Sequence, residues 1–208
     1  GDTDINLFEI TELGCKVHIQ NVTINGMLGS ETAPQSGSIF LVQGNTAALY
    51  LEQDLRTGAV TNNGPTLTGN GKSGNGSAID LEQGLVDISA ATFSNNACVG
   101  TDAQGNNYKG GAIYYAPDSS TTTTTLTFSG SPYIFNNYTW PDDAHLTTSN
   151  VYMGDQLFNV SGDLEDYASI GIDSTLNAGN KIANNTSDPQ KSLNNLGNIP
   201  NDNVAALY

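Results

Sequence analysis

One short pattern recurs four times along the chain: an apolar or aromatic stretch that ends in Asn or Asn-Asn. The four copies are Val22–Asn25, Ala59–Asn63, Thr92–Asn96 and Tyr133–Asn137. Taken at the last apolar position of each copy (Ile24, Val60, Phe93, Phe135), the steps are 36, 33 and 42 residues. A recurrence of about 20–50 residues is typical of a solenoid, in which each repeat stacks on its neighbours. The spacing therefore predicts a repeat architecture before any local pattern is considered.

Two further strand patterns accompany the Asn-ended one in each repeat. A Gly-led pattern occupies 37–42, 76–81 and 110–115, and a shorter one occupies 48–51, 85–88 and 125–128. All alternate apolar and polar residues, as strands with one buried face do. We expect an all-β fold, a single-stranded right-handed parallel β-helix of about four to five coils with loop insertions. The first coil is expected to be partial, with only Val17–Ile19 and Val22–Ile24 as strands.

The Asn and Gly residues of the repeat have predicted structural roles. Asn tolerates the left-handed conformation at a corner, and its amide can bond to an Asn in the next coil. The Gly before the first strand permits a close approach of backbones.

Composition supports this reading and excludes some functions. The chain has 23 Gly, only 13% charged residues and a net charge of −15. Such acidity disfavours nucleic acid and anionic membranes as partners. No apolar run is long enough to span a membrane, and any secretion signal is expected to have been removed. Residues 1–183 are predicted to form the β-helix, and 184–208 an irregular tail or a lead-in to a following domain.

Insertions after the third strand of each coil are the first place to look for binding. They fall at Leu28–Ser36, Thr66–Asn75, Cys98–Lys109 and Asn137–Ser149, and should emerge on one edge of the solenoid. The last insertion holds the single tryptophan. Tyr138, Trp140, Asp142 and Asp143 form the candidate glycan-binding set, because aromatic rings stack on sugars and carboxylates accept their hydroxyl hydrogens. Alternatively, Trp140 folds back and covers the apolar edge of the coil.

The sequence offers little for catalysis. A polysaccharide lyase needs a base such as Arg or Lys, and Arg56 is the single arginine. It follows Asp54, which favours a surface ion pair. A glycosidase needs converging carboxylates. The available carboxylates of neighbouring coils (Glu52, Asp54, Asp80, Glu82 and Asp87) form no stacked trio, and we expect no catalytic residues.

Metal and thiol chemistry is similarly sparse. Asp102–Asn107 and Asp163–Asp166 could hold calcium through oxygen ligands, but neither has EF-hand spacing, and solvated turns are the alternative. Otherwise no cofactor is expected. His18 and His145 are isolated. Cys15 and Cys98 are expected in coils too far apart for a disulfide, so free thiols are predicted.

Some of these motifs resemble known families. Gly110–Ile113 and Phe93–Asn96 resemble the GGA[ILV] and FxxN repeats of chlamydial polymorphic outer-membrane proteins, although Gly76–Ile79 departs from the first of them. Asn150–Tyr152, Phe158–Gly162 and Ala168–Ile172 are similar to a closing coil in β-helical surface proteins of Gram-positive gut bacteria. The resemblance covers about residues 15 to 183. It implies a pectin-lyase-like β-helix at a bacterial cell surface and no particular substrate.

We therefore expect a secreted or cell-wall-attached, non-catalytic module, part of a longer surface protein. It would contact a host or environmental glycan or protein through its loop edge. Two alternatives stay open: a carbohydrate-active enzyme, either lyase or glycoside hydrolase, and a structural spacer without a ligand.

Overall fold

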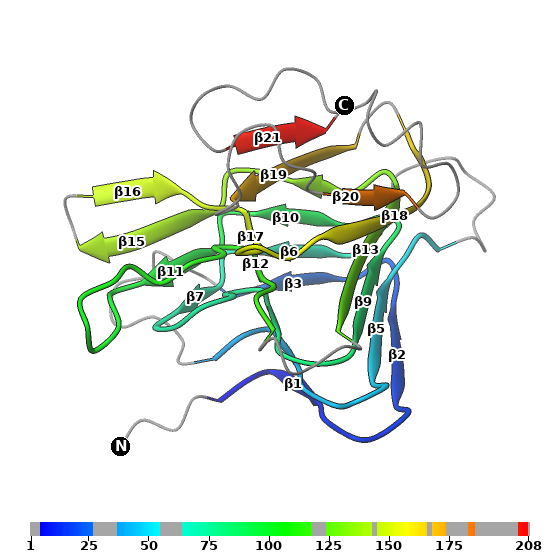
Figure 1. Cartoon of the computed structure of the whole chain (residues 1–208), viewed down its shortest axis with the longest axis horizontal. Coiled ribbons are helices and arrows are strands. Elements are labelled where there is room, and N and C mark those ends of the chain that lie inside the picture. Colours follow the sequence, from blue (N-terminus) through cyan, green and yellow to red (C-terminus); the bar gives the residue numbers. More distant parts are fainter. Residues whose placement is uncertain are drawn as a thin grey trace.

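The computed structural model describes residues 5–26, 37–54, 64–117, 124–142, 145–165, 168–173, 183–185 and 204–207. Within these ranges every regular element is a β-strand. All strand pairs are parallel except β15 with β16 and β19 with β21. The chain rises from its N-terminal strands at the bottom of Figure 1 to its C-terminal strands at the top. The all-β class and the predominance of parallel strands are thus as predicted.

Each of four successive turns of the chain contributes one strand to each of three positions. The first position holds β1 (Phe8–Ile10), β4 (Phe40–Val42), β8 (Ile79–Leu81) and β12 (Ile113–Tyr114). The second holds β2 (Lys16–Ile19), β5 (Ala48–Leu51), β9 (Leu85–Ile88) and β13 (Thr125–Gly130). The third holds β3 (Thr23–Asn25), β6 (Thr66–Thr68), β10 (Thr92–Ser94) and β14 (Tyr133–Ile134).

A further turn follows these four. It contains β17 (Val151–Tyr152), β18 (Phe158–Leu164) and β19 (Ser169–Asp173), after which β20 (Ala183–Asn185) pairs with β18. β19 pairs with both β14 and β17, so the first and third positions belong to one eleven-stranded sheet. The second position forms a six-stranded sheet. The last strand, β21 (Val204–Leu207), lies antiparallel on β19 and falls within the segment 184–208.

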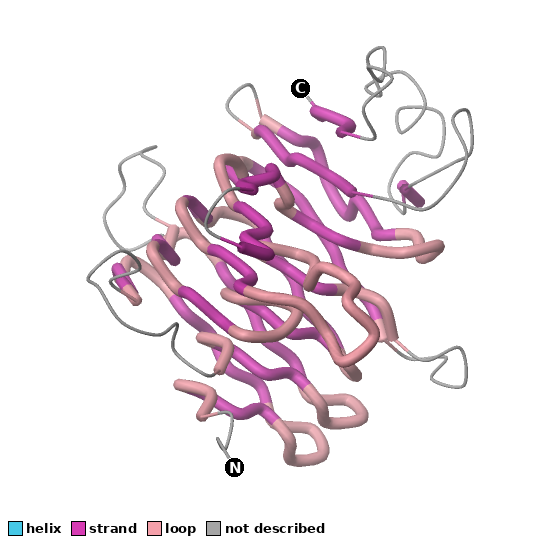
Figure 2. The backbone as a smooth tube through the Cα atoms, turned by 90° about the vertical axis from the view of Figure 1, so that its left-hand side faces the viewer, coloured by secondary structure: helices cyan, strands magenta, loops and turns pink. Residues whose placement is uncertain are grey.

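Strands in the same position stack in register, so their inward side chains form continuous apolar rows. Phe40, Ile79, Ile113 and Val151 make one such row, and all four are fully buried. No single turn could bury its apolar face alone, so each stabilises the next. This layering is visible in Figure 2 and is compatible with a solenoid.

The third position departs from the predicted alignment. Leu67 pairs with Ile24 on one side and with Phe93 on the other, so β6 fills the place assigned to Ala59–Asn63. Residues 59–63 lie outside the described ranges. Phe93 pairs with Ile134, one residue before Phe135. The prediction failed because β6 is followed by Gly69-Asn70 and not by an Asn-Asn pair, and Gly accepts the left-handed corner as readily as Asn.

The first turn is complete, whereas a partial coil was predicted. Phe8–Ile10 pairs in register with Phe40–Val42, and the ring of Phe8 stacks on that of Phe40 at 5.1 Å. The alternation of this strand is short and its first two residues are exposed, which explains why the sequence pattern was weak.

The predicted asparagine ladder is present, but two adjacent residues share its roles. Asn95 and Asn136 take the left-handed conformation (φ 56° and 54°), as Gly69 does in the turn before. The following residue points inward and bonds to its counterparts along the stack. The ladder consists of Asn70, Asn96, Asn137 and Asn150. All four are buried.

Gly-led strands also behave as expected. A Cβ on Gly111 would meet the backbone of Tyr138 at 2.4 Å, and one on Gly37 would meet the carbonyl oxygen of Ile5 at 2.2 Å. Both positions therefore require glycine.

Three of the four predicted insertions contain strands. β7 (Gly71–Lys72), β11 (Ala97–Val99), β15 (Tyr138–Asp142) and β16 (His145–Thr148) form a four-stranded sheet, which we call the side sheet. It projects to the left of the stack in Figure 1. Loops were expected at 66–75, 98–109 and 137–149, but these backbones pair across successive turns. The insertion at 28–36 lies outside the described residues.

Candidate functional site

The predicted aromatic residues lie together on the side sheet. Tyr138 and Trp140 are two residues apart on β15, so their side chains share one face. Both are half-buried. Asp142 ends the strand, pairing with His145 of β16, but its side chain and all of Asp143 lie outside the described residues. The structure thus brings the two aromatic side chains together on one strand.

Apolar side chains border this aromatic face. In the parallel pairing of β11 with β15, the half-buried Val99 lies beside Trp140, and the fully buried Ala97 lies beside Tyr138. Leu146 of β16 is 59% exposed. The strand pairing holds Trp140 through its backbone, because its carbonyl oxygen accepts a hydrogen bond from the Gly100 amide at 2.8 Å. The aromatics therefore stand on a paired strand instead of an irregular loop.

The opposite face of the side sheet packs against the stack. Thr139 is buried, and its hydroxyl donates to the carbonyl oxygen of Tyr108 at 2.9 Å. Beside it, the thiol of Cys98 donates to the carbonyl oxygens of Lys109 and Gly110. Burial raises the pKa of this thiol to about 12, so it is not a nucleophile at neutral pH.

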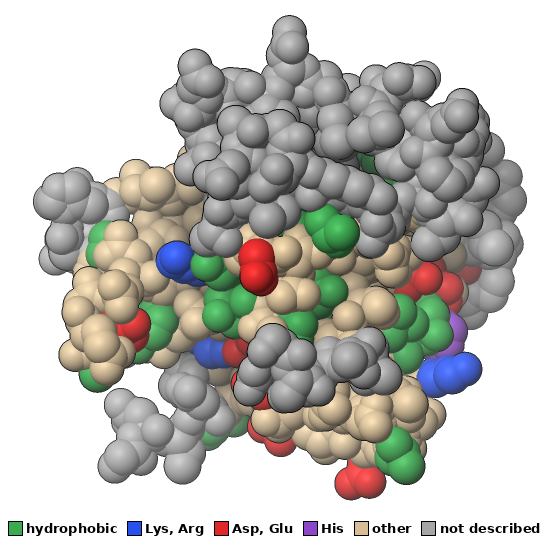
Figure 3. Space-filling view, in the orientation of Figure 1, with side chains coloured by type: hydrophobic (Ala, Val, Ile, Leu, Met, Phe, Trp, Pro, Cys, Tyr) green, Lys and Arg blue, Asp and Glu red, His purple; other side chains and the backbone are tan. Residues whose placement is uncertain are grey.

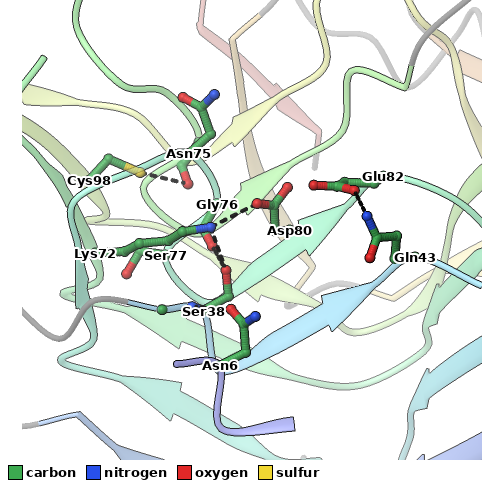
Figure 4. A network of polar contacts seen from close by, with 12 residues as sticks. Asn6, Ser38, Gln43, Lys72, Asn75, Gly76, Ser77, Asp80, Glu82 and Cys98 are labelled. Atoms are coloured by element: carbon green, nitrogen blue, oxygen red, sulfur yellow. Dashed lines mark hydrogen bonds and ion pairs between the residues drawn. The ribbon is translucent and has the colours of Figure 1, made fainter. Parts of the chain in front are cut away.

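Lys72 also belongs to this inner face and makes the most buried ion pair described. Its Nζ lies 2.7 Å from Oδ2 of Asp80 on β8 and donates to Oγ of Ser38 at 2.9 Å (Figure 4). Ser38 in turn donates to the carbonyl oxygen of Gly76. Lys72 and Asp80 are only 6% and 9% exposed. The pair connects the side sheet to the first strand position.

The neighbouring turns carry a tyrosine pair on the outer side of the first position. Asp80, Tyr114 and Tyr152 pair in register on β8, β12 and β17. The two tyrosine rings stack at 5.5 Å with 12° between their planes. The ammonium of Lys109 lies 4.5 Å from the centre of the Tyr152 ring and 3.3 Å from its hydroxyl oxygen. Burial, then the charges of Tyr152, Asp80 and Glu82, raise the pKa of Tyr114.

The carboxylates considered for catalysis are distributed over different surfaces. Asp80 is paired with Lys72, and Glu82 accepts a 2.6 Å hydrogen bond from Gln43. Asp87 and Glu52 lie on the second position, where burial and then the Glu52 charge raise the pKa of Asp87. The two Leu-Glu-Gln triplets fall at different points of the turn, as the sequence indicated. Asp54 is buried, and Arg56 lies outside the described residues.

Two further candidates, His18 and Asp102, have local structural partners, whereas the side chains of His145, Asp163 and Asp166 lie outside the described residues. His18 stacks on Tyr50 at 4.5 Å and contacts Glu52 at 2.9 Å. The Asp102 carboxylate accepts hydrogen bonds from the Gln104 and Asn106 amides and from the Asn106 side chain. Across the described residues, no three His, Cys, Asp or Glu side chains gather as a metal site would require. Cys15 and Cys98 are free thiols.

Charged side chains are scattered over the face in Figure 3, singly or in small groups among polar and apolar atoms. The part of the chain that the structure describes contains no helix long and apolar enough to cross a membrane.

Comparison with known proteins gives no assignment: no family model, curated protein or solved structure matches the chain. The geometry of the sites is therefore the basis for a functional proposal.

Sequence reasoning missed the Lys72–Asp80 pair and the tyrosine stack. The second had a signal: Tyr114 and Tyr152 each follow an apolar residue at the same point of a turn. Aligning Ile113-Tyr114 with Val151-Tyr152 would have placed the rings one above the other. The Lys72–Asp80 pair had no such signal in the sequence, because only the strand pairing of the side sheet brings Lys72 close to Asp80.

Proposed function

We propose that this chain is a non-catalytic, extracellular bacterial module that binds glycans through the aromatic face of its side sheet. The observation that carries the proposal is the placement of Tyr138 and Trp140 on one face of β15, both half-buried. Half-burial fixes the rings while leaving part of each accessible, and an aromatic ring fixed in this way can stack on a sugar.

The fold that we propose to underlie this function is a single-stranded right-handed parallel β-helix of the pectin-lyase-like type. The in-register parallel pairing and the asparagine ladder support it. The resemblance to β-helical surface proteins of Gram-positive bacteria supports a secreted or cell-wall-attached location and a host or environmental glycan as partner. A strongly acidic chain also suits a neutral glycan better than a polyanion, since like charges repel.

The carboxylates of this chain already have other partners, which argues against an enzyme. Asp80 is held by Lys72 and Glu82 by Gln43, on a surface separate from Asp87. A glycosidase needs two carboxyl groups flanking one bond. A polysaccharide lyase or hydrolase of this fold is therefore a less favoured function. A structural spacer without a ligand is the second alternative.

A panel of neutral, amino-bearing and acidic polysaccharides, scored for binding and for cleavage, tests the proposal. Wild type should bind at least one neutral glycan without cleaving it. Trp140→Ala should weaken binding by about five-fold or more, taking as the scale the roughly 1–3 kcal/mol that stacking of a nucleic-acid base on an aromatic ring contributes. Tyr133→Ala, which removes an exposed tyrosine from the stack, is the matched control and should bind normally. Cleavage of any polymer would refute the proposal, and silence across the panel would favour the spacer.

A further inference from the structure

One pair of tyrosines brings two phenol rings into contact on neighbouring turns of the stack. Tyr114 of β12 and Tyr152 of β17 are register partners on adjacent parallel strands, near the centre of Figure 1. Their ring centroids lie 5.5 Å apart, and the ring planes differ by only 12°. Within the described residues no other pair of tyrosine rings is in contact. The fold therefore holds two oxidisable phenols side by side at one place.

The geometry of the pair suits a bond between the ring edges. Nearly parallel rings at this centroid distance are offset, so the edge of one ring lies against the other. Adjacent strands are about 4.8 Å apart, so the two backbones already hold the side chains close together. In a phenol that has lost an electron and a proton, the Cε atoms beside the oxygen-bearing carbon carry unpaired electron density. Small side-chain rotations are then enough for two such carbons to meet.

Both rings are restrained and yet reachable from solvent, since each is half-buried on the outer side of the first position. Lys109 restrains Tyr152 further, because its ammonium lies 4.5 Å from the ring centre and 3.3 Å from the hydroxyl oxygen. Two radicals formed on this pair are held together, which raises their effective concentration above that of radicals on separate molecules. Coupling within one chain is therefore favoured.

Exposure and ring contact select different tyrosines, which makes the site distinguishable. Tyr133 is 39% exposed, but its ring packs on that of Phe135, which has no hydroxyl group. Tyr50 stacks on His18. Coupling controlled by exposure would occur at Tyr133 and would join different molecules. Coupling controlled by contact would join two turns of one molecule.

We propose that Tyr114 and Tyr152 form an oxidative cross-linking site, at which a small one-electron oxidant causes the two rings to join through a carbon–carbon bond. Each phenol gives one electron to an oxidant molecule and one proton to water, and becomes a phenoxyl radical. The radicals couple between Cε atoms, and the hydrogen on each of these carbons then moves to the phenol oxygen. The pair thus loses two electrons and two protons in total, and both hydroxyl groups are regained.

Such a bond would connect two turns that are otherwise held by hydrogen bonds and packing. It would close a loop from residue 114 to residue 152, and a cross-link stabilises a fold by restricting the unfolded chain, as a disulfide does. Tyr138 and Trp140 take no part in the bond, so this inference does not rest on the proposed glycan binding.

Oxidation by photogenerated ruthenium(III) tris(bipyridyl), applied as a short pulse at low protein concentration, tests the proposal. This small cation takes one electron at a time and is attracted to a chain of net charge −15. Wild type should show dityrosine fluorescence in the monomer fraction, a mass lower by two hydrogen atoms, and one linked peptide pair that contains Tyr114 and Tyr152. Tyr114→Phe and Tyr152→Phe should each lose nearly all of the monomer fluorescence. Tyr133→Phe, the matched control, should keep it.

Several results would overturn the proposal. These are an absence of dityrosine in wild type, dityrosine confined to covalent dimers, and a linked peptide pair that joins Tyr133 to another tyrosine. The peptide map of wild type gives this answer without any variant, and circular dichroism verifies that the phenylalanine variants are folded. Oxidised wild type should also unfold at a higher urea concentration than untreated protein, whereas oxidised Tyr114→Phe should not. An unchanged midpoint in cross-linked wild type would contradict a connection between turns.

Discussion

At the scale of single residues, two neighbouring asparagines perform different tasks at each corner. Asn95 is exposed and takes the left-handed conformation, whereas Asn96 is buried and bonds to the turns on both sides. The sequence suggested one asparagine for both tasks. Side-chain direction alternates along the strand, so only the second residue of each pair can point inward.

Substituting each of these two residues separates the tasks. Asn96→Ala leaves the Asn70 amide and the Leu67 carbonyl without their partner, so unfolding free energy should fall by about 2–4 kcal/mol. Asn95→Gly should be neutral within about 1 kcal/mol, because glycine adopts positive φ without strain. Urea unfolding of the two variants provides the measurement. Equal losses in both would contradict the ladder.

The buried ion pair is a second residue-scale feature with a clear expectation. Lys72→Met leaves the Asp80 carboxylate buried without its cation and should cost about 3–5 kcal/mol. The double variant Lys72→Met/Asp80→Leu should recover most of that loss, since an apolar pair needs no compensation for lost hydration. A double-mutant cycle by chemical denaturation measures the coupling. A single variant as stable as wild type would show that the pair is solvated.

The hydrogen bonds of the Asp102 carboxylate lead us to expect a response to pH that is confined to the turn at residues 102–106. Hydrogen bonds from the Asn106 side chain and from backbone amides lower the pKa of Asp102 below its ordinary 3.8. A lowered folded-state pKa gives stabilisation that is complete above the unfolded value and is lost as pH falls through the folded value. The Gln104 and Asn106 amide resonances should therefore shift at a pH below 3.8. A shift at or above that pH would show that the turn does not hold the carboxylate.

At the scale of strands, most of the fold was accessible from the sequence. First- and second-position strands follow a regular apolar alternation, because each has one inward face against a continuous core. The third position was misaligned at Leu67, since the pattern sought an asparagine pair where the corner needs only a residue that tolerates positive φ. The three steps between successive ladder residues are 26, 41 and 13, so a fixed period was a poor guide.

The candidate site was only half accessible from the sequence, for a physical reason. The side sheet forms from backbone pairing between short polar insertions, such as Gly71-Lys72 with Ala97-Cys98. Backbone pairing leaves no apolar alternation to detect. Tyr138 and Trp140 were found because aromatic residues in an insertion are conspicuous, whereas their strand and its partners were not.

Core substitutions at matched positions test the stacking of strands. Leu67 is fully buried between two turns, and Ile24 occupies the same position in the first turn with partial exposure. Leu67→Ala should lower the unfolding free energy by about 2–5 kcal/mol, the usual cost of a large-to-small change in a core. Ile24→Ala should cost less than half as much, because the Ile24 side chain buries less apolar surface on folding. Urea denaturation gives the comparison; a larger loss for Ile24→Ala would contradict this order.

At the scale of the whole molecule, register determines which residues meet on each surface. The tyrosine stack, the Lys72–Asp80 pair and the aromatic face of the side sheet all unite residues from different turns. Shifting one turn by a single residue would move its side chains to the opposite face. The proposed glycan contact therefore depends on this parallel in-register stack.

Inter-strand nuclear Overhauser effects along the third position test that stack most directly. Side-chain protons of Leu67 should show contacts to both Ile24 and Phe93, and those of Phe93 should also contact Ile134. Contacts from Val60 to Ile24 and Phe93 in place of those from Leu67 would contradict the register, and with it every surface described above.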